Sequence, residues 1–281
     1  MHTKCNNFFQ RHIMTFMKAL LAAALVSFAM AAQAGTLMGA GYYTSGVFTF
    51  NTNTGAATLI AGSNDIDNGL GYDSSSGTLY GLRDNQLYTV NTTTGQRTLV
   101  TSLSQFITEL EYNPLDGKMY GILGGGGLAT VNTTTGVVTA IGASDHRDFV
   151  VTLAISGSGQ SYAASVADNK FYEVDLATGA FSLLFNGAFG PESGMTAMAF
   201  DDQDLLYAVG TFSDQLGLID TTTGMFSTLG SFFNGLDRDV RSMEFIGDKR
   251  GTFSAVPEPS SLALIAMALA GLGAVTRRRQ A

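Results

Sequence analysis

Carboxylates are the side chains of this 281-residue sequence that are best placed to do chemistry. Oxygen ligands suit Ca²⁺, which takes six to eight of them, better than Zn²⁺, which prefers nitrogen and sulfur. The acids of interest come just before runs of alternating apolar residues. The alternative is a set of solvated acidic loops, and the spacing does not match an EF-hand loop. The six candidate residues for a cation- or ligand-binding face are Asp65, Asp67, Asp148, Glu192, Asp237 and Asp239.

Other catalytic chemistry has few candidate residues. His146 is the one histidine beyond residue 34, so no polyhistidine metal site can form, and its polar surroundings favour a solvated loop residue. Gly124–Gly127 is not followed by Gly-Lys-Ser/Thr and is therefore no phosphate-binding loop. Two carboxylates could cleave a glycosidic bond, but nothing here singles out a pair at the required separation. We expect no catalytic residues and no cofactor, apart from the calcium considered above.

The distribution of charge limits the partners. The whole chain has a net charge of −8, but six of its fifteen basic residues and none of its acids lie in the first 34 residues and after Pro259. Nine basic residues against 23 acidic ones leave −14 for the part between. This charge disfavours nucleic acid and anionic membrane surfaces, and it suits binding of cations or neutral sugars.

A six-residue phrase, Val-Asn-Thr-Thr-Thr-Gly, recurs letter for letter at 90–95 and 131–136. Related phrases place glycines at 55, 95, 136, 179 and 224, at spacings of 40, 41, 43 and 45. A second motif repeats with the same period as the first, as in GLGYDSSSGTLYGL from Gly69 and ELEYNPLDGKMYGI from Glu109. Each phrase reads as a β-hairpin. Four strands repeated at this period are typical of propeller blades, whereas the coils of a β-solenoid, the competing fold, usually repeat at shorter periods.

The repeated phrase has the chemistry of a turn. Its Asn or Asp can accept a hydrogen bond from the backbone two residues on, and its glycine supplies a positive φ. We therefore expect the outer hairpin of a blade. The capping residues are Asn51, Asn91, Asn132, Asp175 and Asp220.

The ends of the repeat region indicate how the ring closes. Thr36–Gly39 aligns with Thr78–Gly81, so the first repeat starts at a second strand. Ser242–Phe245 aligns with Gly69–Tyr72 and supplies the missing innermost strand. We predict an all-β, five-bladed β-propeller of four-stranded antiparallel blades over residues 35–255, closed by the C-terminal strand joining the N-terminal blade. Four blades would then bring candidate acids to one end of the ring, and the third offers Ser104-Gln105 with Glu109 nearby.

Residues 1–34 have the layout of a secretory signal peptide, with a basic Lys18, the apolar run Ala19–Ala32 and a small-x-small cleavage site at Ala32 and Ala34. We expect a signal peptidase to release a mature protein that starts at Gly35, whichever of Met1, Met14 and Met17 begins the chain. Cys5 lies in the leader, so the mature protein would have neither a cysteine nor a disulfide.

Residues 256–281 combine Pro257-Glu258-Pro259, a 17-residue uncharged segment at 260–276 and the basic Arg277, Arg278 and Arg279. A short transmembrane anchor with its arginines on the cytoplasmic side is one reading. The arrangement resembles the PEP-CTERM sorting signal of Gram-negative bacteria that make extracellular polysaccharide. That resemblance implies transient membrane insertion, removal of the tail by an exosortase, and a final place at the cell surface or in the extracellular matrix.

The Asn/Asp-x-x-Thr-Gly turn resembles those of quinoprotein-like and YVTN-type propellers, which have many functions. Together the two resemblances imply an exported, non-catalytic surface or matrix protein associated with exopolysaccharide. A glycan- or calcium-binding propeller module is the alternative, followed by a polysaccharide-active hydrolase or lyase. Neither the glycan nor the oligomeric state follows from the sequence.

Overall fold

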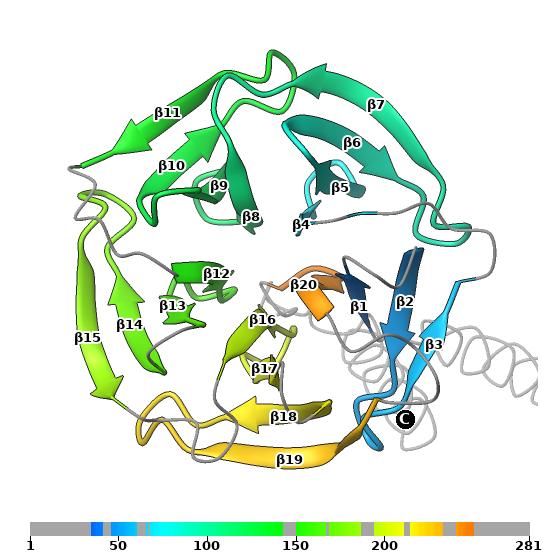
Figure 1. Ribbon diagram of the computed structural model, residues 1–281, viewed down its shortest axis with the longest axis vertical. Coiled ribbons are helices and arrows are strands. Elements are labelled where there is room, and N and C mark those ends of the chain that lie inside the picture. Colours follow the sequence, from blue (N-terminus) through cyan, green and yellow to red (C-terminus); the bar gives the residue numbers. More distant parts are fainter. Residues whose placement is uncertain are drawn as a thin grey trace, which may run out of the picture. The chain divides into compact units, whose positions relative to one another are not determined.

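The structure is a computed structural model that describes residues 35–41, 46–60, 66, 68–142, 150–166, 169–186, 194–210, 214–232 and 240–249. In these residues twenty strands form five four-stranded antiparallel sheets, and no helix occurs among them. The sheets stand as blades around a central axis (Figure 1). The predicted fold, a five-bladed β-propeller, is confirmed.

Each blade runs from an innermost to an outermost strand. The first blade contains β20 (Val240–Ile246), β1 (Thr36–Gly41), β2 (Gly46–Phe50) and β3 (Ala57–Leu59). The second contains β4 (Asn68–Asp73), β5 (Thr78–Arg83), β6 (Gln86–Val90) and β7 (Arg97–Ser102). The third contains β8 (Ile107–Asn113), β9 (Lys118–Leu123), β10 (Leu128–Val131) and β11 (Val138–Ile141). The fourth contains β12 (Val150–Ile155), β13 (Ser161–Ser165), β14 (Lys170–Val174) and β15 (Phe181–Asn186). The fifth contains β16 (Met195–Phe200), β17 (Leu206–Gly210), β18 (Gln215–Ile219) and β19 (Phe226–Ser231).

The ring closes through the first blade, as predicted. β20 is its innermost strand and pairs antiparallel with β1, with Leu37 opposite Phe245 and Gly39 opposite Met243. One strand from the C-terminal part and three from the N-terminal part thus make one sheet. This pairing covers the inner edge of β1, which would otherwise offer unpaired backbone groups.

The core consists of five apolar layers, one between each pair of neighbouring blades. Alternation along each strand sends successive side chains to opposite faces of the blade. In β9, for example, Met119 packs against the second blade and Tyr120 packs against the fourth. Every blade is therefore apolar on both faces, which explains why inner and middle strands read as nearly continuous apolar runs.

The repeated turn has the predicted geometry and a second role. Asn132 Oδ1 accepts hydrogen bonds from the backbone N–H groups of Thr134 at 3.0 Å and Thr135 at 2.9 Å, and Gly136 has φ 74°. A Cβ at Gly136 would overlap the carbonyl oxygen of Ser102 at the end of β7, in the preceding blade. A Cβ at Gly55 would likewise overlap the carbonyl oxygen of Gly230 in the fifth blade, which is the neighbour of the first blade in the ring, and a Cβ at Gly179 would overlap that of Ile141 in the third blade. The glycine therefore serves both the turn and the close approach of neighbouring blades.

Candidate functional site

The predicted acidic face falls outside the described part of the chain. All six of its candidates, Asp65, Asp67, Asp148, Glu192, Asp237 and Asp239, lie there, as do Ala32, Ala34, Pro257–Pro259 and Arg277–Arg279. Gly35 is described and lies against the ring of Phe245 in the closing strand. Among the described residues, no three His, Cys, Asp or Glu side chains are placed to hold a metal ion. The cation-binding face stays a prediction.

A different set of charged side chains meets at the centre of the ring. We call Glu109 and Glu111 of β8, Ser242 and Glu244 of β20, and Lys249 the axial cluster. Lys249 Nζ lies 2.5 Å from Glu111 Oε1 and 2.5 Å from Glu244 Oε1. Ser242 Oγ donates to Glu109 Oε1 at 2.9 Å. Because the first and third blades are separated by the second, these contacts cross the axis lined by β4, β8, β12, β16 and β20 (Figure 1).

The cluster also satisfies backbone groups of the innermost strands. The inner edge of such a strand has no neighbouring strand, so its buried N–H groups need other acceptors. Glu244 Oε2 accepts from the N–H of Tyr72 in β4 at 3.0 Å, and Glu111 Oε1 accepts from the N–H of Ile155 in β12 at 3.2 Å. Ser242 Oγ accepts from the N–H of Leu70 at 2.6 Å. Each acceptor belongs to the blade that precedes its donor, so the cluster links four of the five blades.

Burial governs the protonation of these acids. Glu109, Glu111 and Glu244 are each at most 1% exposed, and Lys249 is 4% exposed. Burial raises the pKa of Glu109 well above its usual value. Burial and the charge of Glu244 raise the pKa of Glu111 to about 8, although Lys249 acts in the opposite direction. Burial alone would lower the pKa of Lys249, but the charges of Glu111 and Glu244 outweigh it and raise that pKa.

Lys249 thus lies between two carboxyl groups, those of Glu111 and Glu244. The raised pKa values of Glu109 and Glu111 favour the protonated forms of these two side chains. Oε2 of Glu109 and Oε2 of Glu111 have no hydrogen-bond partner within the described residues, and both are buried. The three carboxylates are thus withdrawn from solvent, which suits a structural role at the axis better than acid–base chemistry on a polymer.

Sequence reasoning noted Glu109 and missed the rest of the axial cluster. A signal was available, because the aligned innermost strands, apart from Glu244 in the last of them, carry small residues or threonine at the two positions that Glu109 and Glu111 occupy. The aligned pairs are Gly69 and Gly71, Thr152 and Ala154, Ala197 and Ala199, and Ser242 and Glu244. Glutamates at positions otherwise filled by glycine, alanine, serine or threonine indicate a special environment. Lys249 carried no such signal, because it follows the last aligned strand.

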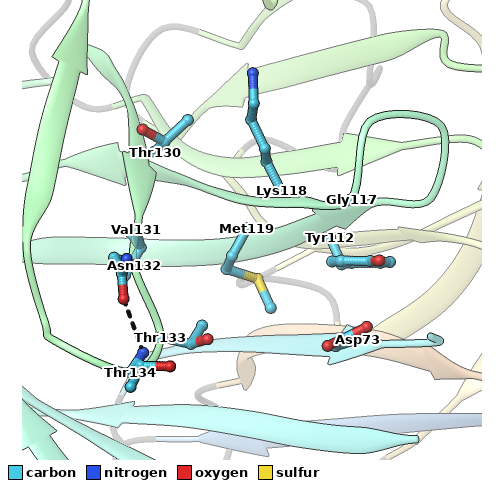
Figure 2. A pocket seen from close by; sticks show the side chains of 10 residues that line it. All are labelled: Asp73, Tyr112, Gly117, Lys118, Met119, Thr130, Val131, Asn132, Thr133 and Thr134. Carbon is cyan, nitrogen blue, oxygen red and sulfur yellow. Dashed lines mark hydrogen bonds between the residues drawn. The ribbon is translucent and has the colours of Figure 1, made fainter. Parts of the chain in front are cut away.

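A polar groove lies between the second and third blades, which we call the 2/3 groove. It has a volume of about 340 Å³. Asp73 contributes from the second blade and Tyr112 and Met119 contribute from the third, together with Asn132, Thr133 and Thr134 of the repeated turn. Figure 2 shows the Met119 thioether, the Tyr112 ring, the Asp73 carboxylate and Thr133 around one space, whereas the amine of Lys118 points away from it.

A second groove, of about 410 Å³, lies on the other side of the third blade. Here the fourth blade's outer turn contributes Leu176 and Ala177 in place of threonines. Asp116 and Tyr120 lie in this groove and form a hydrogen bond of 2.6 Å with each other. Its lining is therefore less rich in available hydroxyl groups than that of the 2/3 groove.

The described strands form a five-bladed β-propeller. A chain from a crystal structure of a nidogen/laminin complex is similar with a TM-score of 0.51 and 12% identity, covering 74% of this chain and 79% of that chain. At this identity the likeness concerns the fold alone. In all, 901 chains of solved structures match this chain. A fold shared by so many proteins does not by itself indicate a particular activity.

Residues 255–279 match the model of the PEP-CTERM protein-sorting motif. The chain is therefore a β-propeller protein that carries a PEP-CTERM sorting motif, which implies export and processing by an exosortase. This agrees with the resemblance found in the sequence. No curated protein matches the chain. The described residues contain no helix long and apolar enough to cross a membrane, and the predicted span at 260–276 lies outside them.

Proposed function

We propose that this is a non-catalytic protein of the cell surface or extracellular matrix, which associates with exopolysaccharide after an exosortase has removed its tail. The observation that carries the proposal is the sorting motif at 255–279, which begins a few residues after the strand that closes the ring. The propeller is complete at Ile246, so removal of the tail leaves every blade intact.

Two further features support this proposal. The net charge of −14 between Gly35 and Pro259 suits a soluble exported protein and disfavours binding to nucleic acid or to anionic lipid. The carboxylates at the axis are buried and engaged in ion pairs and hydrogen bonds, so a polymer chain has no access to them. The first feature favours a neutral polymer as the partner, and the second favours association with that polymer over its cleavage.

Association and cleavage can be tested together. The exported protein should co-sediment with exopolysaccharide purified from its host and should release neither dye from a dyed sample of that polymer nor new reducing ends. Dye release above that of a heat-unfolded control would make the protein an enzyme. Absence from the polysaccharide pellet, with full recovery in the supernatant, would contradict the association.

Processing of the tail needs its own experiment. In a host with an exosortase, mass spectrometry should find a C-terminus near Glu258 in surface material. A variant in which Glu258 is replaced by Ala should keep its tail, whereas Glu192→Ala, a change outside the motif, should be processed normally. Recovery of intact Arg277–Arg279 from the surface would indicate a plain membrane anchor.

A further inference from the structure

We propose that the 2/3 groove binds a neutral saccharide, with the hydroxyl groups of Thr133 and Thr134 and the carboxylate of Asp73 as its polar contacts. The proposal deepens the function proposed above, on which it rests, by assigning the polysaccharide contact to one seam of the ring. It starts from the repeated phrase, whose residues do not all serve the turn.

Only part of the phrase is needed to form the turn. Asn132 caps it, Thr135 Oγ1 accepts a hydrogen bond from the N–H of Val137 at 3.4 Å, and Gly136 provides the positive φ. Within the described part of the chain, no hydrogen bond involves the hydroxyl groups of Thr133 and Thr134. Both residues line the 2/3 groove. Their hydroxyls are therefore available to a ligand.

The fourth blade shows that these two threonines are dispensable for the turn. Its corresponding residues are Leu176 and Ala177, yet Asp175 caps that turn through the N–H of Ala177 at 2.8 Å. Gly179 has φ 72° there, against 74° for Gly136. The turn is thus the same with apolar residues in the middle. Threonines at 133 and 134 add hydroxyl groups that the fold itself does not require.

The remaining lining matches the chemistry of a sugar. A saccharide offers hydroxyl donors and acceptors on its rim and C–H groups on its ring faces, so it suits a site with polar groups beside an apolar surface. Asp73 accepts hydrogen bonds from Ser75 and Ser76, which outweigh the effect of burial and lower its pKa. It is therefore a fixed carboxylate that can accept from sugar hydroxyls. Tyr112 and Met119, which are 7% and 4% exposed, line the groove with a small apolar surface.

The charge of the site selects a neutral ligand. The carboxylate of Asp73 and the net charge of −14 between Gly35 and Pro259 both repel anions such as uronates. The amine of Lys118 points away from the space (Figure 2) and lies 3.7 Å from Asp116 Oδ2. A volume of about 340 Å³ lies at the lower end of the roughly 300–1,000 Å³ typical of small-molecule sites. These features fit a short stretch of a neutral glycan chain.

The structure provides matched variants for the test. Thr133→Leu with Thr134→Ala copies the fourth blade's turn and should leave folding unchanged. Thr92→Leu with Thr93→Ala makes the corresponding change in the identical phrase of the second blade, which does not line this groove. Calorimetric titration of the exported protein would use dextran, cellohexaose and an alginate hexamer as probes.

We expect a neutral probe to bind and alginate not to bind. The variant at 133 and 134 should weaken binding about tenfold or more, as expected for two lost hydrogen bonds, and the variant at 92 and 93 should bind like the parent. Equal binding by all three proteins, or no binding of either neutral probe to the parent, would overturn the site. Co-sedimentation of the variant at 133 and 134 with host exopolysaccharide separates the two proposals. If it still co-sediments like the parent, the association stands and this groove is not its site.

Discussion

Lys249 donates a hydrogen bond to Glu111 at 2.5 Å, although 138 positions separate the two residues in the sequence. Lys249 follows β20, the strand that closes the ring, and Glu111 lies on β8 of the third blade. The C-terminal part of the ring is therefore held twice, by the backbone pairing of β20 with β1 and by this hydrogen bond from Lys249 to β8. Glu244 of β20 completes the arrangement.

Replacing Lys249 by Met should destabilise the protein by about 3–5 kcal/mol, because a buried carboxylate would lose its cationic partner. Urea unfolding monitored by circular dichroism would measure the change. Lys118→Met is the matched control, since the side chain of Lys118 is 60% exposed and its change should cost at most about 0.5 kcal/mol. Equal losses for both variants would show that Lys249 holds nothing at the axis.

The axial cluster predicts how stability depends on pH. Glu111 has a pKa of about 8 in the folded protein and an ordinary, lower pKa when unfolded, so the folded state binds the extra proton between about pH 5 and 8. The raised pKa of Glu109 acts in the same direction. Stability should therefore fall as pH rises through this window, by at most about 1.4 kcal/mol per pH unit for each group.

Thermal melts at pH 5.5, 7 and 8.5 would show this dependence as a decreasing melting temperature. The double variant Glu109→Gln with Glu111→Gln removes both titrating groups and should flatten the curve. A parent whose melting temperature rises over this range would contradict the assigned protonation of the cluster.

Gly179→Ala should destabilise the fourth blade's seam with the third. The φ of 72° costs about 1–3 kcal/mol for a residue with a Cβ, and the overlap of that Cβ with the carbonyl oxygen of Ile141 adds to this cost. Gly125→Ala is the control, because a Cβ at Gly125 would meet nothing within 4 Å. Chemical unfolding of both variants would give the difference, and similar midpoints would contradict a close approach at position 179.

Deleting Val240–Ile246 should open the ring. The deletion removes Met243 and Phe245 from the apolar layer between the first and fifth blades and leaves the inner edge of β1 unpaired. We expect loss of cooperative melting, and aggregation visible in size-exclusion chromatography. A protein that lacks residues 250–281 but keeps Lys249 should elute and melt like the parent. A variant without Val240–Ile246 that elutes and melts cooperatively like the parent would mean that closure is not needed.

The repeat predicted most of the fold, because turns and alternation are local properties. Asn132 and Gly136 could be assigned from sequence since a turn is built from consecutive residues. The contact of Gly136 with Ser102 could not be predicted, because it depends on how closely two blades pack. The same limit applies to the axis. Glu111 and Lys249 meet through the geometry of the closed ring, and no local pattern relates them.

The site was harder to predict than the fold for a further reason. Acids such as Asp65 and Asp239 were chosen because loops that enter innermost strands carry them, and those residues lie outside the described part. The binding site proposed for the 2/3 groove depends instead on Thr133 and Thr134, which the sequence presents as ordinary members of a turn. Comparison with Leu176 and Ala177 in the folded protein shows that the turn does not need these two threonines, and the proposed binding role rests on that difference.

Closure by β20 also determines when, during synthesis of the chain, the first blade can form. Thr36 and Ile246 are opposite each other in the first blade, so β1 must wait for about 210 further residues before its partner exists. At roughly 5–20 residues per second, synthesis alone takes about 10–40 seconds to supply it. During this delay the inner edge of β1 has no partner strand, and an unpaired edge of this kind is prone to aggregate. Because the sorting motif follows β20 so closely, the ring becomes able to close just as the sequence that the exosortase reads becomes available.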